Sequence, residues 1–128
     1  MARLIAALPV VFVSDVTAAA AFYRDSLGFS IDFLHGEPPF YGSVSRDGQR
    51  VHLKFVHEPV IVPSANDRDA FIVVFVEVDD ADGLFAEYHA AGVTIAQRLE
   101  NQPWGWRDFI VEDPDGNRIC FAARIPAK

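Results

Sequence analysis

Near its start the chain reads Pro9-Val10-Val11-Phe12-Val13-Ser14-Asp15 and then becomes rich in alanine. The β-branched and aromatic run is typical of a short strand. Ser14 and Asp15 are good helix N-cap residues, and Gly28 supplies the left-handed residue that often ends a helix. Between them, apolar side chains recur at roughly helical spacing, at Ala18, Phe22, Tyr23 and Leu27. This stretch therefore predicts a strand followed by an N-capped helix that ends near Gly28.

The same order of signals appears a second time farther along the chain. The run Val73-Val74-Phe75-Val76-Glu77-Val78 leads into Asp79-Asp80, another N-cap pair. The helix that follows has Leu84, Phe85 and Tyr88 on one face and stops at Gly92. The chain therefore carries an internal repeat of a strand and a helix.

Three short strands are expected after each helix. We place them at about residues 29–34, 41–45 and 51–56 in the first copy, and at about 94–99, 106–111 and 118–123 in the second. The last two strands of each copy are joined by a turn that contains Asp-Gly, at Asp47-Gly48 and Asp115-Gly116. Glycine accepts a positive φ without steric cost, so Asp-Gly is a strong hairpin signal.

The repeat predicts an α+β fold of two βαβββ modules whose curved sheets surround a cavity. We expect a single domain, 1–128, with a first module at about 4–56, a linker at 57–69 and a second module at about 70–124. The linker is assigned because this segment holds prolines and many polar residues. The alternative is an unrelated α+β domain in which two strand–helix units occur by chance.

Composition limits the class of protein. The 128 residues are 51% hydrophobic, which suits one sizeable core, and a net charge of −7 makes nucleic acid an unfavourable partner. No apolar run is long enough to span a bilayer and no signal peptide is recognisable, so we expect a soluble, cytoplasmic protein without membrane contact. The single cysteine, Cys120, excludes an internal disulfide and favours a buried strand position.

Several motifs resemble one known family over essentially the whole chain. The opening Leu8-Pro9-Val10-Val11-Phe12-Val13-Ser14-Asp15-Val16, followed by Leu27-Gly28-Phe29, resembles the glyoxalase/bleomycin-resistance (vicinal oxygen chelate) superfamily. The closing Gln102-Pro103-Trp104-Gly105 and Asp113-Pro114-Asp115-Gly116-Asn117 are most similar to bleomycin-binding resistance proteins. The resemblance implies the βαβββ fold and a small-molecule ligand.

Enzymes of this superfamily hold a divalent metal with side chains at four inward strand positions. The resemblance identifies the corresponding four positions in this chain. The positions fall on Leu8, Val73, His52 and Cys120. Two of them are aliphatic and cannot donate to an ion, whereas a catalytic metal normally has about three protein ligands. We therefore expect no metal, no cofactor and no catalytic residues, and interpret His52 as part of the cavity wall.

The resemblance to bleomycin binders also implies a set of ligand-binding residues. Trp104 matches the tryptophan that stacks on the flat tail of the drug, and Tyr41, with Phe40 beside it, supplies a second aromatic wall. Residues expected to line the same space are Phe33, Asp32, Trp106 and His52. The segment 34–39 is expected to form a loop that borders this crevice. The alternative is that Trp104 closes the end of a barrel and that Phe40 and Tyr41 hold a loop.

The functional hypothesis is a binding protein that sequesters a bleomycin-like or other flat, cationic antibiotic without chemistry. The resemblance to bleomycin binders also implies a homodimer whose ligand crevices lie between the subunits. A metal-dependent glyoxalase-type lyase or dioxygenase is the alternative from another class, and the missing metal ligands argue against it. A sensor or immunity module with a different ligand is a third possibility, which only a binding screen separates from the first.

Overall fold

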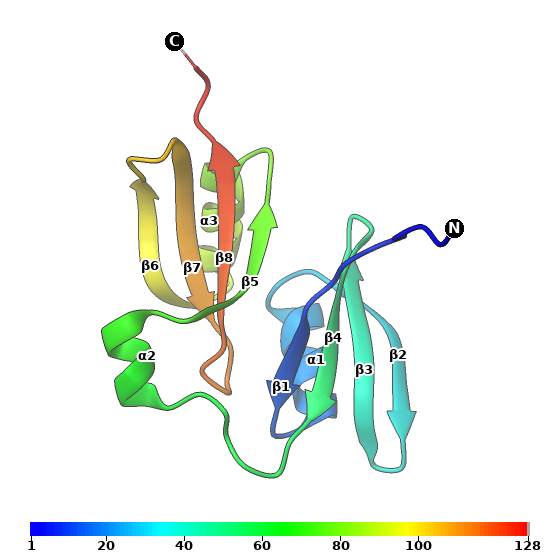
Figure 1. Ribbon diagram of the computed structural model, residues 1–128. Helices are drawn as coiled ribbons and strands as arrows, with labels where there is room; N and C mark the ends of the chain where they lie inside the picture. Colours follow the sequence, from blue (N-terminus) through cyan, green and yellow to red (C-terminus); the bar gives the residue numbers. More distant parts are fainter. Residues whose placement is uncertain (128) are drawn as a thin grey trace. The chain divides into compact units, whose positions relative to one another are not determined.

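The structure is a computed structural model that describes residues 1–127. The chain forms two compact units, Met1–Val60 and Ile61–Lys128. Each unit contains a four-stranded sheet with a helix against one face (Figure 1). The predicted α+β fold of two βαβββ modules is therefore confirmed.

The first unit has its strands in the order β1-β4-β3-β2. The edge strand β1 pairs with β4 in parallel, and the other pairs are antiparallel. The elements are β1 (Val10–Val13), α1 (Val16–Asp25), β2 (Ser30–Gly36), β3 (Pro39–Arg46) and β4 (Gln49–Phe55). The predicted strands thus lie within two residues of the observed ones.

Local chemistry explains where α1 begins and ends. The Asp15 carboxylate accepts a hydrogen bond from the Ala18 backbone N–H at 3.0 Å, as expected of an N-cap. Gly28 has a φ of 77°, which a residue with a side chain rarely adopts. The helix packs against β2, β3 and β4, and alternate residues of β1, Val11 and Val13, are buried. One face of the sheet therefore forms the core, and the other carries no helix.

The second unit repeats this arrangement, with strands in the order β5-β8-β7-β6. Its elements are α2 (Pro63–Asp69), β5 (Ile72–Glu77), α3 (Ala81–Ala90), β6 (Thr94–Asn101), β7 (Trp106–Glu112) and β8 (Arg118–Arg124). Asp80 caps α3 by accepting from the Gly83 N–H at 2.9 Å. Tyr88 of α3 packs against Phe109 of β7 and Phe121 of β8, and all three rings are buried.

The helix α2 was not predicted, because its residues were interpreted as linker. It begins at Pro63. Proline is tolerated in the first turn of a helix, because the N–H group that it lacks would have no hydrogen-bond partner within the helix. The buried Asn66 side chain donates to the Gly116 carbonyl at 3.0 Å and accepts from the Phe71 N–H at 3.1 Å. These bonds join α2 to the β7–β8 hairpin of its own unit. Among residues 1–127, no helix is long and apolar enough to cross a membrane.

Candidate functional site

The sheet of the first unit has a face that does not contact α1, which we call the first helix-free face. Val11 and Val13 of β1 point to the core, so Val10 and Phe12 lie on this face. The strand register then places His52 beside Val10 and Ser43 beside His52. The face is formed by Val10, Phe12, Asp32, Phe33, Tyr41, Ser43, Ser45, Arg50, His52 and Lys54. Four of the residues predicted to bind ligand are brought together here.

Tyr41, His52 and Phe33 form an aromatic cluster on this face. The Tyr41 hydroxyl and His52 Nδ1 are 2.9 Å apart, within hydrogen-bond distance. The His52 ring lies edge to face with Tyr41 at a centroid distance of 5.4 Å and with Phe33 at 6.2 Å. The rings hold one another in place, so the cluster offers a flat ligand a rigid surface.

Asp32 lies beside this cluster because β2 has a bulge. The register shifts between Ile31 and Phe33, which leaves Asp32 as the extra residue. Its two carboxylate oxygens accept hydrogen bonds from the hydroxyls of Ser45 at 2.7 Å and Ser43 at 2.8 Å. These bonds, the one from Ser45 first, lower the pKa of Asp32 below its usual value. The carboxylate is therefore ionised at neutral pH and already has partners on both oxygens.

The segment 34–39 was predicted to be a loop, and this was wrong. β2 continues to Gly36 and β3 begins at Pro39, so His35 pairs with Tyr41 in the sheet. The reason is Gly36, whose φ of 104° allows a tight reversal. Phe40 packs edge to face on His35 at 5.4 Å and is half-exposed. Phe40 thus lies at the end of the hairpin, next to the aromatic cluster in sequence.

The second unit has a corresponding second helix-free face. Phe75 of β5, Trp106 of β7 and Arg124 of β8 lie on it. The Trp106 ring meets Phe75 at 5.6 Å, and the Arg124 guanidinium lies over the ring at 5.0 Å. Arg124 also pairs with Glu77 at 3.1 Å. Trp106 is therefore already engaged by side chains of its own unit.

Trp104 has a different environment from Trp106. It lies in the turn between β6 and β7 and is 67% exposed. The Gln102 N–H donates to the Trp106 carbonyl at 2.7 Å, and the Ile125 N–H donates to the Gly105 carbonyl at 2.8 Å. Within the described residues, the Trp104 indole has no aromatic partner. An ordered turn therefore presents this indole to solvent, which is suitable for stacking on a ligand.

Asp108 is a further candidate site residue, which the sequence reasoning missed. Its Oδ1 accepts hydrogen bonds from the side-chain amides of Gln97 at 2.7 Å and Gln102 at 3.0 Å. Burial, with a smaller contribution from the Asp108 charge, raises the pKa of the neighbouring Cys120 thiol to about 12. The alternation of strand β7 was the available signal, because Asp108 follows Trp106 by two residues and so shares its face.

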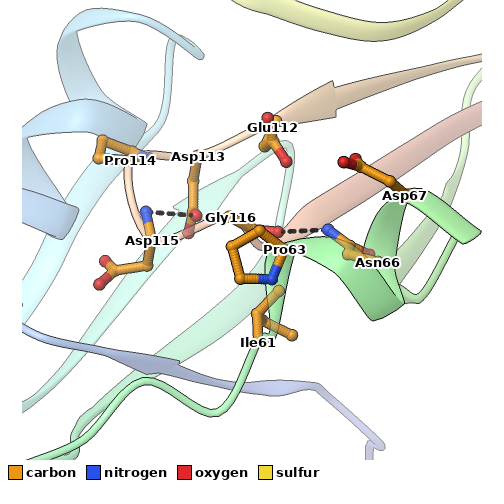
Figure 2. A pocket seen from close by; sticks show the side chains of 9 residues that line it. All are labelled: Ile61, Pro63, Asn66, Asp67, Glu112, Asp113, Pro114, Asp115 and Gly116. Atoms are coloured by element: carbon orange, nitrogen blue, oxygen red, sulfur yellow. Dashed lines mark hydrogen bonds between the residues drawn. The ribbon is translucent and has the colours of Figure 1, made fainter.

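A separate recess of about 370 Å³ lies between α2 and the β7–β8 hairpin of the second unit (Figure 2). It is lined by Ile61, Pro63, Asn66, Asp67, Glu112, Asp113, Pro114, Asp115 and Gly116. Asn66 and Asp113 are its buried members. Asp113 accepts hydrogen bonds from the N–H groups of Asp115 at 2.9 Å and Asn117 at 2.8 Å and from the Asn117 side-chain amide at 2.9 Å. None of the predicted ligand-binding residues lines this recess, and we interpret its hydrogen bonds as structural.

The predicted site residues thus fall into two groups. Within its own unit, each group lies on or next to a helix-free face: Asp32, Phe33, Phe40, Tyr41 and His52 in the first, Trp104 and Trp106 in the second. Residues 1–127 contain no group of three or more His, Cys, Asp or Glu side chains that could hold a metal ion.

Comparison with known proteins extends these observations. The family model of the Glyoxalase/Bleomycin resistance protein/Dioxygenase superfamily matches residues 5–121. A bleomycin resistance protein of Geobacillus stearothermophilus is 30% identical over 129 residues, which cover 92% of this chain and 96% of the relative.

Two crystal structures of binding proteins are also similar. A bleomycin-binding protein from bleomycin-producing Streptomyces verticillus, complexed with copper(II)-bleomycin, is 28% identical with a TM-score of 0.74, over 99% of this chain and 100% of that one. An antibiotic binding protein from Streptomyces sp. CB03234 is 28% identical with a TM-score of 0.72, over 97% of this chain and 98% of that one.

Proposed function

Because this chain belongs to the Glyoxalase/Bleomycin resistance protein/Dioxygenase superfamily, we propose that it binds a bleomycin-like antibiotic and sequesters it without chemistry. Relatives named as bleomycin resistance and bleomycin-binding proteins match nearly its full length. The observation that carries the proposal is the exposed indole of Trp104, held by an ordered turn in the Gln102-Pro103-Trp104-Gly105 motif.

The two helix-free faces support this function chemically. Flat heteroaromatic ligands bind to rigid π surfaces, and small-molecule sites combine such surfaces with a few polar groups. The cluster of Phe33, Tyr41 and His52 supplies a rigid π surface, and Asp32 supplies an ionised carboxylate beside it. We therefore propose that the residues predicted to bind ligand, Asp32, Phe33, Phe40, Tyr41, His52, Trp104 and Trp106, contact the antibiotic.

Replacement of Trp104 by Ala tests this function. We expect the affinity for copper(II)-bleomycin, measured by calorimetry, to fall by about 1 to 3 kcal/mol, because one stacking surface is lost. The melting temperature should change little, since the indole is 67% exposed. In the wild type, the ligand should quench tryptophan fluorescence.

The matched control is Phe71→Ala, which removes a half-exposed aromatic side chain of the same unit that is not in the proposed site. Its affinity should equal that of the wild type. A Trp104→Ala protein with unchanged affinity and a much lower melting temperature would place the indole in the core and remove the main support for bleomycin binding.

We also propose that the protein acts as a cytoplasmic homodimer. Exposed apolar side chains, among them Val10, Phe12 and Phe33, lie on the first helix-free face, and a second copy would bury them. Sedimentation at micromolar concentration should give a mass near twice the 14.2 kDa of one chain. A species of 14.2 kDa alone would contradict the dimer.

A further inference from the structure

The Asp108 carboxylate lies in an unusual place for a charged group. The residue is only 5% exposed and sits on the second helix-free face, opposite Ala122 in the strand register. Ile110, Cys120 and Ala122 form a buried apolar cluster, and Trp106 packs against it. A carboxylate among such residues loses much of its hydration, so it needs hydrogen-bond partners within the protein or from a ligand.

The partners of Asp108 satisfy only part of this need. Gln97 and Gln102 both donate to the same oxygen, Oδ1. Among residues 1–127, Oδ2 accepts no hydrogen bond, and Asp108 forms no salt bridge. Amide donors are neutral, so they supply hydrogen bonds without balancing the charge. Oδ2 is not among the fully buried unpaired side-chain atoms of residues 1–127, so this oxygen reaches the surface of the helix-free face, where a ligand donor could meet it.

Two other carboxylates on the helix-free faces are compensated by hydroxyl donors or cations, whereas Glu100, which lies opposite Asp108 in the strand register, is exposed and accepts a hydrogen bond from the Gln102 amide at 3.4 Å. Asp32 accepts from Ser45 on one oxygen and from Ser43 on the other, and Arg50 lies 3.7 Å from it. Glu77 pairs with Arg124 at 3.1 Å. Asp108 therefore differs from Asp32 and Glu77, because among residues 1–127 no donor contacts its Oδ2 and the Glu100 carboxylate opposite it adds negative charge instead of balancing it.

We propose that Asp108 Oδ2 binds a protonated nitrogen of the ligand, next to the aromatic surface of Trp106. The ligand class is a flat aromatic molecule that carries an ammonium or amidinium group. A charge-assisted N–H bond to Oδ2 would complete the hydrogen bonding of the carboxylate and balance its charge in one contact. The role of this contact in antibiotic capture rests on the proposed function, whereas the cation preference of the site does not.

The variant Asp108→Asn tests the contact in the full chain. Asparagine keeps an oxygen for Gln97 and Gln102 but removes the charge. We expect its affinity for copper(II)-bleomycin to fall about tenfold or more, and the affinity to depend less on NaCl than in the wild type. The control Asp79→Asn makes the same charge change at an exposed position and should bind like the wild type.

Two results would overturn the proposal in this experiment. One is an Asp108→Asn protein that binds copper(II)-bleomycin as tightly as the wild type. The other is a loss of affinity with an unchanged salt dependence, which would mean that Asp108 only positions Gln97 and Gln102. In both cases the wild type still binds, so the proposed function would stand.

A second experiment needs only the wild type and no antibiotic. Tryptamine carries an ammonium group on an indole, and N-acetyltryptamine has the same ring without the charge. Nuclear magnetic resonance should show that millimolar tryptamine shifts the backbone amide signals of Asp108 and Ala122, while N-acetyltryptamine does not. Equal shifts with both probes, or none with either, would overturn the proposal. A tryptamine shift without copper(II)-bleomycin binding would instead reject the antibiotic function and leave the cation site in place.

Discussion

Replacement of Phe109 by Ala should lower the free energy of unfolding by about 3 to 5 kcal/mol. The Phe109 side chain is 0% exposed. Its ring lies 5.4 Å from Phe85, 5.4 Å from Phe121 and 6.2 Å from Tyr88. Truncation would remove the ring at the centre of this cluster and leave a cavity that the sheet and α3 cannot close without moving. Urea unfolding followed by circular dichroism measures the loss.

Phe75→Ala is the matched control, because it removes the same ring from the same sheet on the opposite face. Phe75 is 55% exposed, and its ring contacts the Trp106 ring edge to face. We expect a loss of less than about 1 kcal/mol. Equal losses for the two variants would contradict the division of this sheet into a core face and a helix-free face.

Lowering the pH from 7 to 4 should increase the free energy of unfolding, because the Asp113 carboxyl takes up a proton more readily in the folded protein. Burial raises the pKa of Asp113 from 3.8 to about 6, although hydrogen bonds from Asn117 and Asp115 oppose the shift. Between these two values the folded state binds a proton that the unfolded state releases. The free energy of unfolding therefore falls as pH rises through this window, by about 3 kcal/mol in total from this group.

The measurement compares wild type with Asp113→Asn in urea unfolding at several pH values. Asn does not titrate, so the stability of wild type relative to this variant should increase by about 2 kcal/mol between pH 7 and pH 4. Asp47→Asn is the control, because Asp47 lies in the equivalent hairpin of the first unit with its side chain 91% exposed. Its profile should follow that of the wild type. Parallel profiles for wild type and Asp113→Asn would show that Asp113 has no raised pKa.

The architecture was predictable because its signals are local. Asp15 and Asp80 cap their helices within one turn, and Gly28 and Gly92 have the positive φ that ends each helix segment. A cap or a reversal needs only neighbouring residues, so the sequence contains all the physics required. The repeat of these signals was enough to predict two βαβββ modules, whereas the family was predicted from the resemblance of motifs such as Gln102-Pro103-Trp104-Gly105.

The helix α2 and the extended β2–β3 hairpin were not predictable in the same way. α2 has few apolar residues, and its hydrogen bonds reach Gly116 and Arg118, about 50 positions away in the chain. The segment around Gly36 has the glycine and prolines of a loop, but pairing of His35 with Tyr41 draws it into the sheet. In both cases a partner outside the segment decided its structure.

The sequence by itself determined the module order, the helix ends, the hairpins and the identity of most aromatic candidates. Only the tertiary structure decided which of these side chains share a face. Simple alternation would place Asp32 and Phe33 on opposite faces of β2, yet the bulge puts both on the helix-free face. The register of β6 against β7 similarly brings Gln97 to Asp108. A one-residue shift in pairing turns every later side chain to the other face, and such shifts depend on the neighbouring strand rather than on local sequence.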